Sequence, residues 1–520
     1  MAQKPEDGAV GTTPGAGRWV LIGSILASSM AFIDGSALNV ALPALQRDLG
    51  ANGAEILWII NGYLLMLAAF IVLGGALGDQ LGRKRVFMAG IAVFGLASLA
   101  CGLAPTTLVL IGARVVQGIG GALMIPGSLA LISAAFGPSE RGKAIGTWSA
   151  VTTLVTVAGP ILGGFLADAG LWRGVFLINL PIGIAALLIL WTKVAESRNP
   201  AATGPIDLPG AGLVALGLAG ITYGFISAPA LGFGDPRVAG ALIVGFVALA
   251  AFIVVEQHSG QPMVPLRLFR SRTFLGANLV TLLLYGALGV GTLFLSLNLV
   301  QSQGYTQTEA GLSFTPFALL LAGLSRWAGG LIDRFGPRLP LVIGPALAGC
   351  GFLLFAAVGL TSGPAAYWTT FFPGVVVFGL GLAVTVAPLT TAVMGAVPGD
   401  ASGTASGINN AVARSASVLA IAVVGALVLA IFSTALADRT AGIDLAQSAR
   451  AALQAQAAKL GGTGVPAGLS PAQAAAVQQS IKLAFVSAFN VVMLICTSLA
   501  WLSALIAALV IERQGNAPRR

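Results

Sequence analysis

Long apolar segments separated by short polar ones dominate the hydropathy pattern of this 520-residue chain. A helix that crosses the hydrocarbon core of a membrane needs about 20 mainly apolar residues. Segments of this kind predict fourteen membrane-spanning helices, near residues 18–42, 56–78, 86–104, 108–135, 144–167, 174–195, 210–229, 236–256, 273–301, 309–332, 339–360, 367–396, 403–434 and 483–511. The pattern therefore predicts an all-α membrane protein.

The composition agrees with this pattern and excludes several classes of protein. Hydrophobic residues make up 57% of the chain and charged residues only 9%, whereas soluble proteins carry about 25% charged residues. A cytosolic enzyme, a secreted domain and a disordered chain are thereby excluded. The three cysteines stand apart in apolar segments, and His258 is the single histidine. We therefore expect no disulfide framework, no metal, no cofactor and no enzymatic activity.

The net charge of +9 is distributed unevenly along the chain. Of the 27 Lys and Arg residues, 17 fall in the N-terminal tail and the loops on one predicted side, seven on the other, and three inside spans. Four of those seven lie in the long segment 435–482, which counts little in the positive-inside rule. The bias predicts that both termini are cytoplasmic. It assigns the basic charge to the inner membrane surface, so no nucleic acid is expected as a partner.

The predicted spans divide into two six-helix bundles with two extra helices between them. Within segment 435–482, Ser470, Pro471 and Gln473 have the spacing of a helix start. The expected organisation is a disordered cytoplasmic tail at 1–17, a first bundle at 18–195, a linker with two extra spans at 196–272, a second bundle at 273–511 that includes the extracytoplasmic loop 435–482, and a cytoplasmic tail at 512–520.

Two loops, eight spans apart, repeat one pattern. Residues 75–85 read GALGDQLGRKR and residues 329–338 read GGLIDRFGPR, so that Gly, Leu, Asp, Gly and a basic residue coincide. A carboxylate at a helix end beside a glycine turn and a basic cluster predicts an electrostatic contact on the inner face, which we call the inner-face clasp. A plain positive-inside loop would explain the basic residues only. The predicted clasp residues are Gly75, Asp79, Gly82, Arg83 and Lys84, and in the second copy Asp333, Gly336 and Arg338.

One acidic residue, Asp34, lies deep within a predicted span. Acids inside the membrane are costly and usually functional. Arg114 in the fourth span lies at a similar depth: Asp34 is about 13 Å and Arg114 about 9 Å below the outer surface at 1.5 Å per residue. The pair could be purely structural. We favour a carboxylate that takes up and releases a proton under the influence of Arg114.

Other polar groups within the spans are candidates for a substrate cavity. Arg414 falls near the middle of the thirteenth span, where it could meet an anionic substrate group or anchor a hydrogen bond. Four amides could line the cavity or join helices instead: Asn39, Gln117, Asn409 and Asn410. Residues 137–143 have the spacing of a phosphate-binding loop, but Ala144 stands where such loops need Ser or Thr. We therefore exclude ATP.

The repeated loop resembles the cytoplasmic-loop motif of the major facilitator superfamily, and the whole chain resembles its fourteen-span drug:proton antiporter family. Similar segments are residues 33–43 in the first span, 114–122 in the fourth, 159–164 in the fifth, 176–183 in the sixth and 405–411 in the thirteenth. Gly159, Pro160, Gly163 and Gly164 would form the antiporter motif. The sequence departs from the family at Val155, where Gly is usual, and at Gly174, where Trp is usual.

The resemblance implies proton-driven export of amphipathic drugs or toxic compounds by a monomer in a bacterial cytoplasmic membrane. The partners would be protons, a small amphipathic substrate and the lipid bilayer. Two alternatives remain open at this point. One is an exporter dedicated to a single endogenous metabolite or antibiotic, and the other is a membrane receptor that transports nothing.

Overall fold

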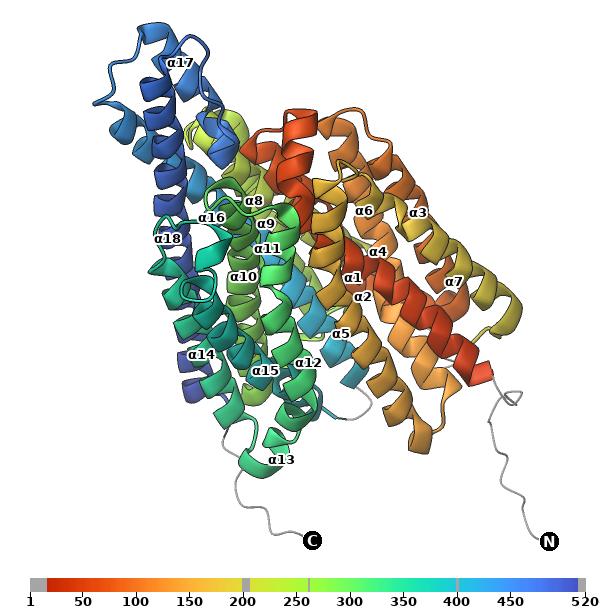
Figure 1. Ribbon diagram of the computed structural model, residues 1–520. Coiled ribbons are helices and arrows are strands. Elements are labelled where there is room, and N and C mark those ends of the chain that lie inside the picture. The colour runs from red at the N-terminus through yellow and green to blue at the C-terminus, as the bar shows by residue number, and fades with distance from the viewer. Residues whose placement is uncertain (1–15, 199–205, 261, 399–401, 513–520) are drawn as a thin grey trace, which may run out of the picture.

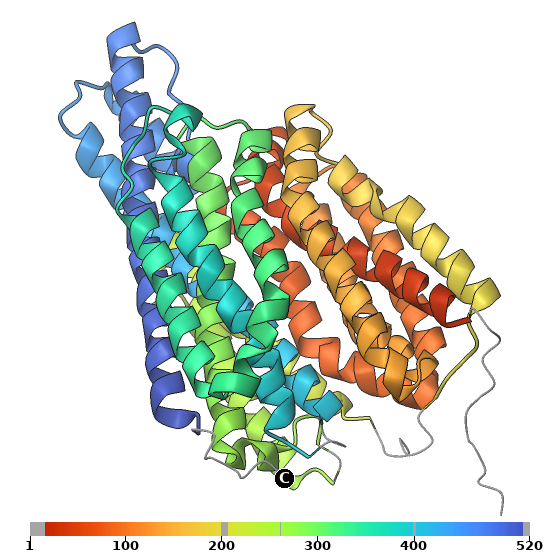
Figure 2. The same cartoon turned by 60° about the horizontal axis from the view of Figure 1, so that its bottom comes forward.

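The computed structural model describes residues 16–198, 206–260, 262–398 and 402–512. Across these ranges the chain forms helices and no strands, which confirms the all-α prediction. Figure 1 shows most of the helices side by side along one common direction, and Figure 2 shows the same bundle from a view tilted toward one end.

The first half of the molecule contains seven helices. Several begin where the sequence supplies a cap: Asn52 and Glu55 form a reciprocal capping box at the start of the second, and Thr106 caps the fourth. The helices are α1 (Ala16–Leu49), α2 (Gly53–Leu81), α3 (Arg83–Gly102), α4 (Thr107–Ala135), α5 (Pro138–Asp168), α6 (Gly174–Leu177) and α7 (Asn179–Lys193).

Two long helices follow the first half, α8 (Leu208–Leu231) and α9 (Pro236–His258), with the short η1 (Leu266–Arg270) after them. α8 packs where the two halves meet. Its Leu218 joins a buried cluster with Leu65 of α2 and Val418 of the second half. α9 leaves large apolar side chains such as Phe246 and Val247 exposed, as expected of a helix that faces lipid.

The second half begins at α10 and ends at α18. Its elements are α10 (Arg272–Gln301), α11 (Gln307–Ser313), α12 (Thr315–Gly329), α13 (Leu331–Phe335), α14 (Arg338–Ala356), η2 (Pro364–Ala366), α15 (Phe371–Gly395), α16 (Ser402–Thr440), α17 (Gln447–Gln456), η4 (Ala457–Gly462) and α18 (Pro471–Val510).

Thirteen helices in the described part of the chain are long and apolar enough to cross a membrane, when α6 and α7 are counted together as Gly174–Lys193. The stretch 309–332, predicted as one membrane span, is divided among α11, α12 and α13. Pro316 stands in the first turn of α12 and has no N–H to donate to the carbonyl of Leu312. The helix therefore breaks at Phe314, and again at Gly330.

The segment 435–482 folds beyond the end of the bundle. α16 and α18 extend into it, and α17 and η4 lie between them (Figure 1). The predicted helix start is confirmed, because Ser470 and Gln473 form a capping box and Pro471 is the first residue of α18. η4 contacts the first half through Gln46 of α1, whose amide donates to the Lys459 carbonyl at 2.9 Å and accepts from Gln301 of α10 at 2.8 Å.

Candidate functional site

A buried ion pair lies in the first half. One guanidinium nitrogen of Arg114 is 2.5 Å from the Asp34 carboxylate, and the side chains are 2% and 0% exposed respectively. The Gln117 amide joins both, since it donates to Asp34 at 2.9 Å and accepts from Arg114 at 2.6 Å. The two charged residues that the sequence placed at matching depth are therefore in direct contact.

Further hydrogen bonds complete the surroundings of this pair. Arg114 also donates to the Ile59 carbonyl at 3.1 Å, and its guanidinium carbon lies 4.4 Å from the centre of the Tyr63 ring. Gln117 donates to the Ser98 hydroxyl, which also accepts from Asn179. A buried ion pair is tolerated only when such partners offset the loss of hydration. The cluster of Asp34, Arg114, Gln117, Ser98 and Asn179 is named the acid cluster below.

Glycines bring the helices of the acid cluster together. A Cβ atom at Gly118 would overlap the Tyr63 carbonyl of α2, and one at Gly120 would lie 2.5 Å from the Phe94 backbone nitrogen of α3. Only glycine allows helix backbones to approach so closely. The resemblance pointed to this stretch of α4, but sequence reasoning missed Ser98 and Tyr63, because neither stands in a recognisable pattern.

The four motif residues of α5 form tight contacts. Added Cβ atoms at Gly159 and Gly163 would overlap Ser36 and Ala37 of α1, which is the neighbouring helix of the same half. One at Gly164 would overlap the backbone of Gln307 in α11, which belongs to the other half. α5 continues through Pro160, whose carbonyl in turn leaves no room for a Cβ at Gly311.

The contact between α5 and α11 closes the molecule at the end nearest α17. Asp168, at the last turn of α5, accepts hydrogen bonds from the backbone N–H groups of Gln307 and Thr308 and from the Thr308 hydroxyl. A carboxylate is stabilised at the start of a helix because the first N–H groups lack partners within it. The two halves are therefore held together at this end.

The first copy of the inner-face clasp is an ion pair across one helical turn. Arg83 contacts Asp79 at 2.7 Å, and between them Gly82 takes a φ of 119°, which favours glycine. Sequence reasoning missed Glu196, which accepts from the Lys84 N–H at 2.9 Å at the start of α3. A Cβ added at Gly75 of α2 would lie 3.7 Å from Pro126 of α4.

The second copy of the inner-face clasp repeats the glycine turn and one contact with the end of another helix. Gly336 has a φ of 73°. The guanidinium of Arg338, two residues on, donates to the Ala508 carbonyl in the last turn of α18. Lys84, two residues after Gly82, likewise donates to the Val194 carbonyl at the end of α7, at 2.6 Å. The side chain of Asp333 lies outside the described residues.

The candidate cavity residues separate into three groups. Gln117 is buried in the acid cluster, and Asn409, which is partly exposed, donates to Asn278 and Thr281 of α10, so both amides join helices. Asn410 is exposed and donates to the Ser406 carbonyl of its own helix. Asn39 and Arg414 are partly exposed.

Open space lies beside the middle of α1. Gly35, next to Asp34 in the chain, is exposed, and a Cβ added there would meet no atom within 4 Å. Within the described residues, no group of three or more His, Cys, Asp or Glu side chains is placed to hold a metal ion.

Comparisons with known proteins agree with this architecture. The sequence profile of the Major Facilitator Superfamily matches residues 24–421. The chain belongs to this superfamily of transporters. It is accordingly a transporter, and a multi-pass protein of the bacterial cytoplasmic membrane.

Curated relatives carry names of resistance and export proteins. The tetracenomycin C resistance and export protein of Streptomyces glaucescens is 32% identical over 511 residues, covering 96% of this chain and 94% of that protein. The multidrug resistance protein Stp of Mycobacterium tuberculosis is 35% identical, covering 80% and 76%. A probable actinorhodin transporter of Streptomyces coelicolor is 35% identical, covering 85% and 78%.

Solved structures share the fold at low sequence identity. A bacterial homologue of the human lysosomal transporter Spinster, crystallised in an inward-facing, unoccupied conformation, is 20% identical with a TM-score of 0.62, covering 98% of this chain and all of the other. The peptide transporter PepTSo is 13% identical with a TM-score of 0.66, covering 96% and 98%. These likenesses concern the fold alone.

Proposed function

We propose that this transporter exports small amphipathic drugs or toxic compounds in exchange for protons, and that Asp34 carries the proton. The observation that carries the proposal is the acid cluster, in which a carboxylate and a guanidinium are both buried inside one half. The names of the relatives, which include antibiotic and multidrug resistance proteins, support export of such compounds.

The acid cluster suits proton exchange because Arg114 balances the charge of Asp34 only while α1 and α4 stay together. In the described conformation Arg114 and Gln117 both donate hydrogen bonds to the Asp34 carboxylate. A conformation that opens the end near α17 and separates α1 from α4 would favour the protonated form. One proton would then enter from outside and leave inside in each cycle.

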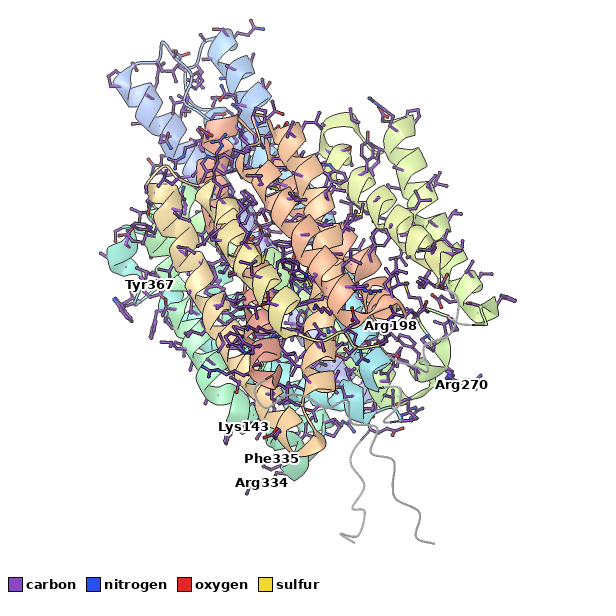
Figure 3. The ribbon with its side chains drawn as sticks, turned by 90° about the vertical axis from the view of Figure 1, so that its right-hand side faces the viewer. Lys143, Arg198, Arg270, Arg334, Phe335 and Tyr367 are labelled. Carbon is purple, nitrogen blue, oxygen red and sulfur yellow. The ribbon has the colours of Figure 1, made fainter. Side chains whose placement is uncertain are left out.

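We also propose fourteen crossings, with both termini in the cytoplasm and a monomeric transporter. The first turn of α1 and the last turn of α18 lie at the same end of the bundle (Figure 1), which supports an even number of crossings. α11 and α12 together would supply the fourteenth. The basic residues Lys143, Arg270 and Arg334 lie toward that same end (Figure 3), as the positive-inside rule requires of a cytoplasmic face.

Labelling with a membrane-impermeant thiol reagent tests this orientation in intact cells. The background is Cys350→Ser, because Cys350 is the exposed cysteine whereas Cys101 and Cys496 are buried. Ser448→Cys on α17 should be labelled, and Gln257→Cys at the end of α9 should be labelled only after the cells are broken. The reverse pattern would contradict the orientation.

The decisive experiment on function compares two Asp–Arg pairs that both involve α1. Purified protein is reconstituted in proteoliposomes, and accumulation of a fluorescent dye is followed under an imposed pH gradient. Asp34→Asn should abolish uphill accumulation and leave downhill exchange, because the amide resembles the protonated acid. Asp48→Asn is the matched control: Asp48 contacts Arg173 at 2.6 Å but is 48% exposed. Uphill transport by Asp34→Asn equal to that of wild type would sink the proposal.

A second candidate function is export of one endogenous metabolite or antibiotic. Two of the relatives cited above are named for single compounds, tetracenomycin C and actinorhodin. A panel of unrelated dyes and antibiotics, tested in the same proteoliposomes, separates the two functions by the number of compounds moved.

A further inference from the structure

Arg414 is a cation without a counter-charge where the two halves meet. It lies 12 residues into α16, about 18 Å from its start at 1.5 Å per residue. Among the described residues Arg414 makes no hydrogen bond and no ion pair, and it is only partly exposed. A charge held inside a bundle without a partner is costly, and such residues commonly serve transport.

Two tyrosines lie on the helices that pack against α16 beside this cation. Tyr63 of α2 belongs to a buried cluster against which Ala411 of α16 packs, and Tyr285 belongs to α10. α10 packs directly on α16 at this level, since the Ser417 hydroxyl donates to the Tyr285 carbonyl at 3.2 Å. Neither phenol oxygen has a hydrogen-bond partner in the described part of the chain; Tyr285 is half-buried and Tyr63 is buried.

The geometry points to a binding site for the anionic group of an amphipathic acid, formed by the guanidinium of Arg414 and the hydroxyl groups of Tyr63 and Tyr285. A guanidinium suits a carboxylate or sulfonate because its planar N–H groups pair with two oxygens at once. The hydroxyl groups of the two tyrosines add uncharged hydrogen-bond donors for the same anionic group. The inference rests on the proposed export function and adds compounds with an acidic group to its amphipathic substrates.

The site would also connect the substrate to the acid cluster. The ring of Tyr63 lies 4.4 Å from the guanidinium carbon of Arg114, which holds Asp34. Tyr63 belongs to the first half, and Tyr285 and Arg414 to the second. An anion bound between them therefore makes contacts that change when the halves move, which is the condition for a ligand to shift a conformational equilibrium.

The test uses two xanthene dyes of opposite charge, the anion fluorescein and the cation rhodamine 123. Binding of each dye to the purified full-length protein is measured by fluorescence polarisation without a proton gradient. Arg414→Gln should weaken fluorescein binding by at least about tenfold, the loss of a charge-assisted contact. Tyr285→Phe and Tyr63→Phe should each weaken it by a few fold, and Arg414→Lys should restore part of the loss. Rhodamine 123 binding should change less than twofold, which also shows that the variants are folded.

Arg439→Gln is the matched control, because Arg439 is an exposed arginine of the same helix that donates to Ser487. The inference is overturned if wild type does not bind fluorescein. It is also overturned if Arg414→Gln weakens both dyes equally, as it would if Arg414 serves only as a partner for Asp34 or as a structural anchor. Failure of the proposed function has another signature: binding would persist, but wild-type protein would accumulate no dye under a pH gradient.

Discussion

The two halves of the molecule share a contact at the end of their last helix and differ in their buried polar groups. In each, a basic residue two positions after a left-handed glycine donates to a carbonyl at the end of that half's last helix, Lys84 to Val194 and Arg338 to Ala508. The buried polar contacts are unlike each other. The first half encloses the ion pair of Asp34 and Arg114.

In the second half, a polar contact between α10 and α16 consists of neutral groups. Asn409 donates to Asn278 and to Thr281, at 3.2 and 2.6 Å. Neutral hydrogen bonds hold helices together over a wide range of pH, whereas an ion pair depends on the protonation of its acid. The comparison teaches that the repeat preserves the ends of the helices, while the buried ion pair lies in the first half and Arg414, unpaired among the described residues, lies in the second.

The strongest way to break this comparison is to remove one member of each buried contact. Arg114→Ala leaves Asp34 as an uncompensated buried charge and should lower the free energy of unfolding by about 3–5 kcal/mol. Asn409→Ala removes neutral hydrogen bonds and should cost about 1 kcal/mol. Unfolding in a detergent–denaturant series measures both.

The double variant Asp34→Asn/Arg114→Met provides the control, because no charge is then left buried. It should recover most of the stability lost in Arg114→Ala while remaining unable to drive transport with protons. If Arg114→Ala and Asn409→Ala lower the free energy of unfolding equally, the buried contacts of the two halves do not differ in kind.

Adjacent glycines of α5 sharpen the comparison between contacts within a half and contacts between halves. Gly163→Val should overpack α5 against α1 and destabilise the fold by about 1–3 kcal/mol. Gly164→Val meets the backbone of Gln307 in the other half, and the halves can relieve the overlap by separating. It should therefore favour the conformation that is open at that end.

A cysteine at Gln307, which is 1% exposed, reports this opening. Its labelling by an impermeant thiol reagent should speed up severalfold in Gly164→Val and remain slow in Gly163→Val. Gly146→Val should neither destabilise the fold nor speed up the labelling, because a Cβ at Gly146 meets no atom within 4 Å. Slow labelling in all three variants would argue that the contact of α5 with α11 does not hold this end closed.

The smallest effects are expected at Lys84 and Arg338, the residues that contact a helix end in each half. Lys84→Met and Arg338→Met each remove hydrogen bonds to backbone carbonyls, a loss of about 0.5–1.5 kcal/mol. Both should slow dye transport by a few fold and leave expression unchanged. Asp79→Asn, which removes the ion pair with Arg83, should slow it further. If the dye transport rates of Lys84→Met and Arg338→Met differ by more than tenfold, the two copies of the loop do not play equivalent roles.

Part of this site followed from the sequence by simple geometry. A helix rises by a fixed distance per residue, so the depths of Asp34 and Arg114 could be calculated and matched. The capping residues Ser470 and Gln473 act within one helical turn, and they too were predicted. Local patterns of this kind depend on residues close together in the chain.

Contacts between distant parts of the chain escaped sequence reasoning. Glu196 binds the start of α3 from 112 residues away, and nothing in its own surroundings marks it. Gln117 was expected to line a cavity, because an amide on a helix can face a neighbour or open space and the sequence does not say which. The break in 309–332 was missed because the stretch is long and apolar even though Pro316 interrupts its hydrogen bonds.

The position of α8 bears on how a compound dissolved in the bilayer reaches the transporter. α8 covers the seam where α2 meets α16, through Leu218 packed between Leu65 and Val418. The opposite seam, between α5 and α12, has neither of the two inserted helices among its principal neighbours in the described part of the chain. Lateral entry from the lipid is thus screened along one side of the molecule and unscreened along the other, so the two extra helices give a nearly twofold architecture a preferred flank.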